Sequence, residues 1–198
     1  MDLTILIVGL GGLGSVLLEL LARSSLSCRL IVGSRNRLHG RACCNLAKLG
    51  AQAQGYDPDI DFIYLDLDEH KATIKTIQSI SPDIIVCTAT RQSWWLPRQL
   101  PAPQASRFKS AGFSLWLPLH LSLPTALMRI LHSADYRGFT LIAPFPDVVN
   151  CILDRIGLSP TCGIGNVDEI AAKVRGLAAV KLGVPIDEVA VALVGHHA

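Results

Sequence analysis

Charged residues are scarce in this chain. They make up 17% of its 198 residues, and the formal net charge at pH 7 is only +2. So mild a balance gives no electrostatic basis for binding nucleic acid or a membrane surface. Half of the residues are hydrophobic, which argues against disorder and allows a substantial core.

Cysteine patterns typical of metal sites and disulfide scaffolds are also missing. The six cysteines form no C-x-x-C pair and no regular framework. We therefore expect no metal site and interpret the cysteines as reduced structural thiols of a cytoplasmic protein. No signal peptide is recognisable, because Asp2 stands where a basic segment would be expected.

One long hydrophobic run is present, from Ile5 to Ala22. It is about long enough to span a bilayer, but four glycines interrupt its centre and Glu19 lies near its end. A buried strand, a tight turn and a helix explain these features better than a membrane span. We therefore expect no contact with a membrane.

Short apolar runs and helical patterns alternate through the chain, which predicts an α/β fold with a doubly wound parallel sheet. The pattern predicts strands at 3–9, 28–34, 61–67, 82–90, 138–145 and 188–198, and a strand-to-turn element at 161–166. It predicts the later helices at 37–50, 69–80, 148–158 and 167–183, and a further helix that begins after Pro124 and runs to 134. The proline-containing segment 91–112 is expected to be a long loop, and such loops are usually functional or mobile.

The first strand–helix turn contains a G-x-G-x-x-G pattern made by Gly9, Gly11 and Gly14. In this context the glycines allow a tight turn, close approach of a pyrophosphate and close packing of the helix. The helix N-terminus adds unpaired N–H groups and partial positive charge. We predict a dinucleotide-binding loop that also includes Gly12 and Leu13. The alternative is a tight glycine turn in some other α/β domain.

The end of the second strand lacks the carboxylate that NAD-binding chains usually place there. Ser34 and Arg35 could bind a 2′-phosphate, with Arg37 as a second cation, so NADP is favoured over NAD. Asp66 near the end of the third strand and Thr88 near the end of the fourth complete the predicted cofactor site. Asp66 could equally be an exposed acid at a strand end.

The second half of the chain carries three features that resemble the lactate/malate dehydrogenase superfamily. They are "APFPDVV" after the fifth strand, "GIGNVDEIAAKVR" at a long helix, and "KLGVPIDEVAVALVGHHA". The resemblance implies a dinucleotide-binding Rossmann domain over 1–145 and the beginning of a catalytic lobe over 146–198. It also implies hydride transfer with a small oxo, hydroxy or amino acid, and assembly as a homo-oligomer.

The resemblance places His197 at the family's catalytic histidine, which exchanges a proton with the substrate. His196 is the alternative. Asp168, or else Glu169, would orient the imidazole. The following residues are the candidates for binding the substrate's negative charge: Arg91 and Arg98 in "TATRQSWWLPRQL", and Lys173 or Arg175 on the long helix.

The sequence departs from the family pattern at two places. Ala171 stands where the D-x-x-R arginine would be, and Ala143 stands where the family has asparagine before proline. Trp94 and Trp95 would form a large apolar lid or pack in a core or interface. Two other functions therefore remain open. One is a relative of the NAD- and metal-dependent glycosidases of family 4, although Gly165 replaces their ligand cysteine; the other is a non-catalytic NADP-binding sensor or degenerate enzyme.

Overall fold

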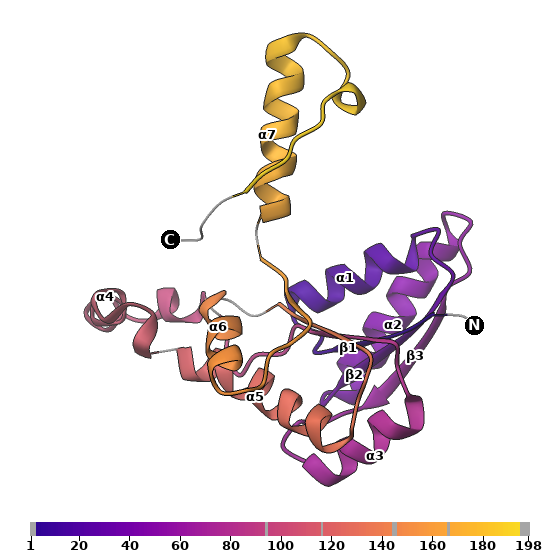
Figure 1. The fold of residues 1–198 in the computed structure, drawn as a ribbon, viewed down its shortest axis with the longest axis vertical. Coiled ribbons are helices and arrows are strands. Elements are labelled where there is room, and N and C mark those ends of the chain that lie inside the picture. The colour runs from indigo at the N-terminus through magenta and orange to yellow at the C-terminus, as the bar shows by residue number, and fades with distance from the viewer. Residues whose placement is uncertain (1–2, 94, 116, 144–145, 166, 195–198) are drawn as a thin grey trace. The chain divides into compact units, whose positions relative to one another are not determined.

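The computed structural model describes residues 3–93, 95–115, 117–143, 146–165 and 167–194. By internal contacts the chain divides into two units, Met1–Gly163 and Ile164–Ala198. The first unit contains a six-stranded sheet and the helices that cover it (Figure 1).

The elements of the first unit follow the alternation that the sequence predicts. In chain order they are β1 (Leu3–Val8), α1 (Gly12–Ala22), β2 (Cys28–Ser34), α2 (Arg37–Gln52), β3 (Asp59–Tyr64), α3 (His70–Ile80), β4 (Ile84–Cys87), the 3-10 segment η1 (Leu96–Gln99), α4 (Ala102–Ala111), the 3-10 segment η2 (Gly112–Leu115), α5 (Leu117–Ser133), β5 (Phe139–Ile142), α6 (Val148–Arg155) and β6 (Cys162–Gly163).

The six strands run parallel in the order β3-β2-β1-β4-β5-β6. The chain starts in the middle of the sheet, adds β2 and β3 on one side, and then returns to pair β4 with the other side of β1. The strand order therefore reverses between β1 and β4. In open α/β sheets, ligands bind beyond the carboxyl ends of the strands at such a reversal. The predicted doubly wound α/β fold is confirmed.

The central strands place their side chains alternately in two hydrophobic layers, because successive strand residues point to opposite faces. Ile5 and Ile7 pack with α1 and α2, whereas Leu6 and Val8 pack with α3, α5 and α6. Figure 1 shows α1 and α2 on one side of the strands and α3 and α5 on the other. Burial on both faces explains why β1 reads as an uninterrupted apolar run.

The segment after β4 contains more helix than the sequence indicates. Helices η1 and α4 occupy most of the expected loop at 91–112, and α5 begins at Leu117 rather than after Pro124. Proline lacks the N–H that a helix interior requires. Helix α5 nevertheless continues through Pro124, because Leu123 and Leu127 are buried against the sheet and tertiary packing outweighs the lost hydrogen bond.

The second unit contains α7 (Val167–Leu182), where the sequence predicts a helix, and the short η3 (Ile186–Glu188). Arg175 Nε donates a hydrogen bond of 2.9 Å to the carbonyl oxygen of Ile186, which joins the two elements. The strand expected over 188–198 is not formed in its described part, residues 188–194, which joins no ladder of the sheet.

The contacts separate the two units after Gly163. The expected division into a dinucleotide-binding domain over 1–145 and a catalytic lobe over 146–198 stays a prediction. Helix α6 packs on the sheet through Val149 and Leu153, and β6 extends the sheet beside β5. Both elements therefore belong to the first unit. Within the described part of the chain, no helix has the length and apolar character needed to cross a membrane.

Candidate functional site

The turn after β1 depends on two glycines that have no room for a side chain. Gly9 has φ +99°, and a Cβ there would lie 2.8 Å from the backbone N and Cα of Ala89. A Cβ at Gly14 would overlap the carbonyl oxygen of Gly9. The first and third glycines of the motif therefore serve the fold itself. One allows the left-handed backbone of the turn, and the other allows α1 to pack closely on it.

Gly11 and Gly12 differ, because the protein leaves the space beside them open. A Cβ at either position would meet no atom within 4 Å. The backbone of Gly11 is extended, with φ −80° and ψ −166°, which any residue adopts. Neither packing nor backbone strain within the chain explains glycine at this position. Close approach of a ligand to the backbone does explain it.

Helix α1 begins at this turn without a side-chain cap, since its N-cap residue is Gly11. The first helical hydrogen bond runs from Ser15 N to Gly11 O, at 3.0 Å. The N–H groups of Gly12, Leu13 and Gly14 precede that bond and carry the positive end of the helix dipole. Together with the open space beside Gly11, they form a place suited to an anionic group.

Hydrogen bonds from neighbouring elements hold the turn in position. Thr88 Oγ1 donates to the Gly9 carbonyl at 2.8 Å, and Gly9 N donates to the Gly33 carbonyl at 2.9 Å. His39 Nε2 lies 3.1 Å from the Leu10 carbonyl oxygen. Because a carbonyl only accepts, Nε2 carries the hydrogen in this pair. The ends of β1, β2 and β4 are therefore joined through the turn.

A cleft of about 420 Å³ lies at the carboxyl ends of the strands, where the strand order reverses. Its volume is within the range of about 300–1,000 Å³ that is usual for ligand sites. The following residues line it: Val8, Gly9, Leu10, Gly11, Gly33, Ser34, Arg35, Asn36, His39, Leu65, Asp66, Leu67, Thr88, Ala89, Thr90, Arg91, Gln92, Ser93, Leu96 and Leu123. The glycine turn and the ends of β2, β3 and β4 thus surround one cavity.

The end of β2 contributes a hydroxyl and a cation to the cleft. Ser34 Oγ accepts a hydrogen bond of 3.3 Å from Asn36 N, and Asn36 Oδ1 caps α2 by accepting from His39 N at 3.0 Å. The guanidinium of Arg37 lies over the ring of Tyr64, 4.3 Å from its centroid. Arg37 therefore packs on the end of β3, which leaves Arg35 as the β2-end arginine that lines the cleft.

Asp68, in the loop after β3, joins two arginines that line the cleft. Its carboxylate accepts a bidentate hydrogen bond from Arg91, with 2.7 Å between Arg91 Nη1 and Asp68 Oδ2. The same Oδ2 lies 4.0 Å from Arg35 Nη1. The hydrogen bond and charge of Arg91, followed by Arg35, lower the pKa of Asp68 below its ordinary value. Sequence reasoning missed this residue, although "DLDEH" places a second acid shortly after Asp66.

The loop after β4 is fixed to α5 by a buried histidine that the sequence analysis also missed. Thr90 Oγ1 lies 3.2 Å from His120 Nδ1 and donates to the Gln92 carbonyl at 2.9 Å. His120 is 2% exposed, and burial lowers the pKa of its imidazole. Arg91 N donates to the Leu119 carbonyl at 3.1 Å. The backbone that carries Thr90 and Arg91 is therefore attached to α5.

The structure brings the predicted cofactor residues together at one cleft, whereas the predicted catalytic residues fall outside what it describes. The following lie around or beside the cleft: Gly9, Gly11, Gly12, Leu13, Gly14, Ser34, Arg35, Asp66, Thr88 and Arg91. His197 lies outside the described residues, and the side chains of Arg98 and Asp168 are likewise outside the description. Lys173 is exposed on α7 of the second unit. The described residues contain no group of three His, Cys, Asp or Glu side chains arranged around a metal.

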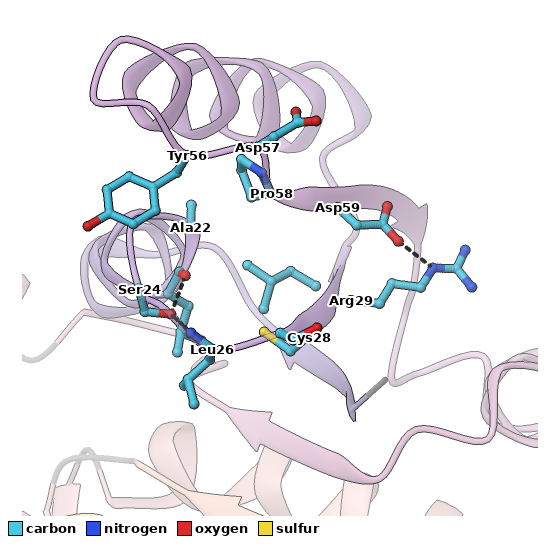
Figure 2. A pocket seen from close by; sticks show the side chains of 12 residues that line it. Ala22, Ser24, Leu26, Cys28, Arg29, Tyr56, Asp57, Pro58 and Asp59 are labelled. Atoms are coloured by element: carbon cyan, nitrogen blue, oxygen red, sulfur yellow. Dashed lines mark hydrogen bonds and ion pairs between the residues drawn. The ribbon is translucent and has the colours of Figure 1, made fainter. Parts of the chain in front are cut away.

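A second cavity, of about 220 Å³, lies at the amino ends of the strands, beside the first residues of β2 and β3 (Figure 2). Ser24, Cys28 and Tyr56 are among its lining residues. Burial raises the pKa of the Cys28 thiol, which disfavours the nucleophilic thiolate. Arg29 forms an ion pair with Asp59 at 3.7 Å. The Cys28 thiol is thus disfavoured as a nucleophile and Arg29 is paired, and the glycine turn lies at the other end of the strands.

Sequence comparisons find no relatives of this chain. No family model matches it, and no curated protein is similar to it in sequence. Structural comparison does find similar folds among solved proteins.

Malate and lactate dehydrogenases are among the similar structures. Malate dehydrogenase from Plasmodium falciparum has a TM-score of 0.64 at 16% identity over 94% of this chain and 52% of its own. The enzyme from Picrophilus torridus has a TM-score of 0.65 at 16% identity over 94% of this chain and 53% of its own. Lactate dehydrogenase from Cryptosporidium parvum, complexed with lactic acid and nicotinamide adenine dinucleotide, has a TM-score of 0.65 at 13% identity. The match covers 96% of this chain and 53% of the dehydrogenase chain.

These similarities show a Rossmann-type fold of the lactate and malate dehydrogenase kind. The chain spans about half the length of each of these structures.

Proposed function

We propose that the chain binds a nicotinamide dinucleotide in the cleft and acts as an NADP-dependent oxidoreductase of a small oxo, hydroxy or amino acid. One observation supports the binding site above all others. Gly11 and Gly12 leave open space at an uncapped helix N-terminus, and the cleft beside them lies where the strand order reverses. Positions that the fold would allow to carry side chains carry none, as a bound pyrophosphate requires.

The residues around the cleft fit the parts of such a cofactor. The N–H groups of the first turn of α1 would bind the pyrophosphate. Ser34 and Arg35 would bind a 2′-phosphate at the end of β2, since a hydroxyl and a guanidinium both donate hydrogen bonds to phosphate oxygens. Asp66, whose Oδ1 already accepts from Asp68 N at 3.0 Å, would contact the adenosine portion.

The nicotinamide ring supplies or accepts the hydride when the cofactor is bound. In this proposal His197 gives or takes the proton at the substrate oxygen, and Asp168 orients its imidazole. Arg98 or Arg91 would bind the substrate's negative charge. These roles come from the resemblance of the sequence to the dehydrogenases, and the fold similarity to malate and lactate dehydrogenases supports them.

Titration with NADPH and NADH, followed by nicotinamide fluorescence, tests the proposal. We expect saturable binding of both, with NADPH tighter because Arg35 lines the β2 end of the cleft. Equal affinity would refute the role of Arg35 in cofactor choice. Binding of neither dinucleotide would refute the proposed function.

The variant Gly11→Val tests whether the dinucleotide occupies this site. Its side chain would enter open space, so we expect an unchanged melting temperature. It would also fill the space proposed for the pyrophosphate and weaken dinucleotide binding by roughly tenfold or more, which corresponds to about 1.4 kcal/mol. The matched control is Gly176→Val on α7, where a Cβ also meets no atom within 4 Å. Unchanged affinity in Gly11→Val would place the dinucleotide elsewhere.

A further inference from the structure

Two arginines of the cleft share an acid, Asp68, that the sequence analysis did not single out. Asp68 lies between Arg35 and Arg91, both of which line the cleft. Two guanidinium groups and one carboxylate leave this group with a net charge of +1 rather than +2. The electrostatic environment of a bound cofactor therefore depends on the carboxylate as much as on Arg35.

We propose that Asp68 reduces the preference for NADP that Arg35 gives the cleft, because its carboxylate opposes the 2′-phosphate at Arg35. The inference rests on the proposed function. NAD carries a hydroxyl at that position, which a nearby carboxylate tolerates. NADP carries a phosphate of nearly two negative charges, which would have to approach Arg35 with Asp68 already 4.0 Å from its Nη1. Asp68 thus weakens the binding of NADP and leaves that of NAD nearly unchanged.

The contacts of Asp68 keep its carboxylate in place and ionised. Arg91 holds both carboxylate oxygens, and the backbone N–H of Asp68 donates to Asp66 Oδ1 at 3.0 Å. The hydrogen bond from Arg91 is also the main reason that the pKa of Asp68 lies below its ordinary value. The carboxylate therefore remains charged at neutral pH and cannot be neutralised by a proton when a phosphate arrives.

Exposure limits the size of this effect. The side chains of Arg35, Asp68 and Arg91 are 55%, 48% and 31% exposed, so water and salt screen their interactions. Exposed charge pairs contribute little individually. The effect of Asp68 on NADP binding should therefore be modest at low ionic strength and should decrease as salt is added.

Substitution of Asp68 by asparagine tests the proposal, because the amide keeps the shape and removes the charge. We expect Asp68→Asn to bind NADPH about fivefold more tightly at low salt and to bind NADH with nearly the wild-type affinity. The gain should shrink at high salt. Both dissociation constants are measured by nicotinamide fluorescence, and the melting temperature of each variant checks its folding.

Three further variants separate the local charge from other causes. Asp68→Glu keeps the charge and should keep the wild-type ratio of affinities. Asp59→Asn makes the same change in net charge at the opposite end of β3, where Asp59 pairs with Arg29, and should also leave the ratio unchanged. Arg91→Gln removes the partner that neutralises Asp68, so it should weaken NADPH binding more than NADH binding.

The outcomes distinguish this inference from the proposed function. Wild-type protein that binds neither dinucleotide refutes both. Wild-type protein that binds dinucleotides, with an unchanged or lowered NADPH preference in Asp68→Asn, refutes only the role of Asp68. Equal tightening of NADPH and NADH would show a general attraction for the pyrophosphate and would likewise refute a role in specificity. A selective gain for NADPH supports the proposal.

Discussion

Replacing Gly14 by alanine should destabilise the protein, although alanine is the better helix former. The new Cβ would overlap the Gly9 carbonyl oxygen and lie 2.6 Å from Thr88 Oγ1. Overpacking of this kind costs about 1–3 kcal/mol. Displacing Thr88 would also weaken its 2.8 Å hydrogen bond to the Gly9 carbonyl, which contributes about 1 kcal/mol. The higher helix propensity of alanine offsets about 1 kcal/mol of this destabilisation. The expected net loss is therefore about 1–3 kcal/mol.

Thermal unfolding followed by circular dichroism measures this loss. For a chain of this size, each kcal/mol lowers the melting temperature by about 2–4 °C, so Gly14→Ala should melt about 2–12 °C lower. Gly12→Ala is the matched control, because it changes the same helix at a position where a Cβ meets no atom within 4 Å. If Gly14→Ala melts at the same temperature as Gly12→Ala, the close packing described for the turn is wrong.

Two further predictions concern the interior of the first unit. Burial lowers the pKa of His120 below its ordinary 6.5, so the unfolded chain binds this proton more readily than the folded protein. The free energy of unfolding should therefore fall as the pH drops below about 6.5. The variant His120→Gln should reduce this fall, whereas His132→Gln, at an exposed position, should leave it unchanged. Equal pH dependence in the two variants, measured by urea unfolding, would contradict this. In thiol labelling mapped by mass spectrometry, the exposed Cys151 and Cys162 should react in the folded protein, whereas the buried Cys44 and Cys87, each with a pKa raised to about 11, should react only in denaturant. Rapid native labelling of Cys87 would refute its burial.

The sheet could be predicted from the sequence because its signals are local. Strands β1, β2, β4 and β5 lie in short apolar runs, and the glycine turn after β1 marks the change from strand to helix. The helices of the segment 91–112 could not, because α4 has no buried residue and hence no apolar periodicity to reveal it. The strand predicted over 188–198 rested on its apolar composition. A strand also needs a neighbour for its backbone groups, and the pattern contains no information about one.

The candidate site was predictable where a residue type alone indicates its role. Glycines mark the turn, but the sequence does not distinguish Gly9 and Gly14, which the fold requires, from Gly11, which it does not. Asp68 and Arg91 lie 23 residues apart in two different loops. Their pairing depends on how the loops after β3 and β4 meet at the edge of the sheet, which no local pattern encodes.

The position of β1 at the centre of the sheet affects the order in which the protein can assemble. Ile5 pairs in register with Ile84, so one side of the first strand has no partner until β4 has been synthesised. Until then, that strand exposes apolar side chains and unpaired backbone groups, the combination that promotes aggregation of nascent chains. The pairing of β4 with β1 covers this vulnerable edge and also brings Thr88 to the glycine turn, so the same step protects the strand and begins to form the candidate site.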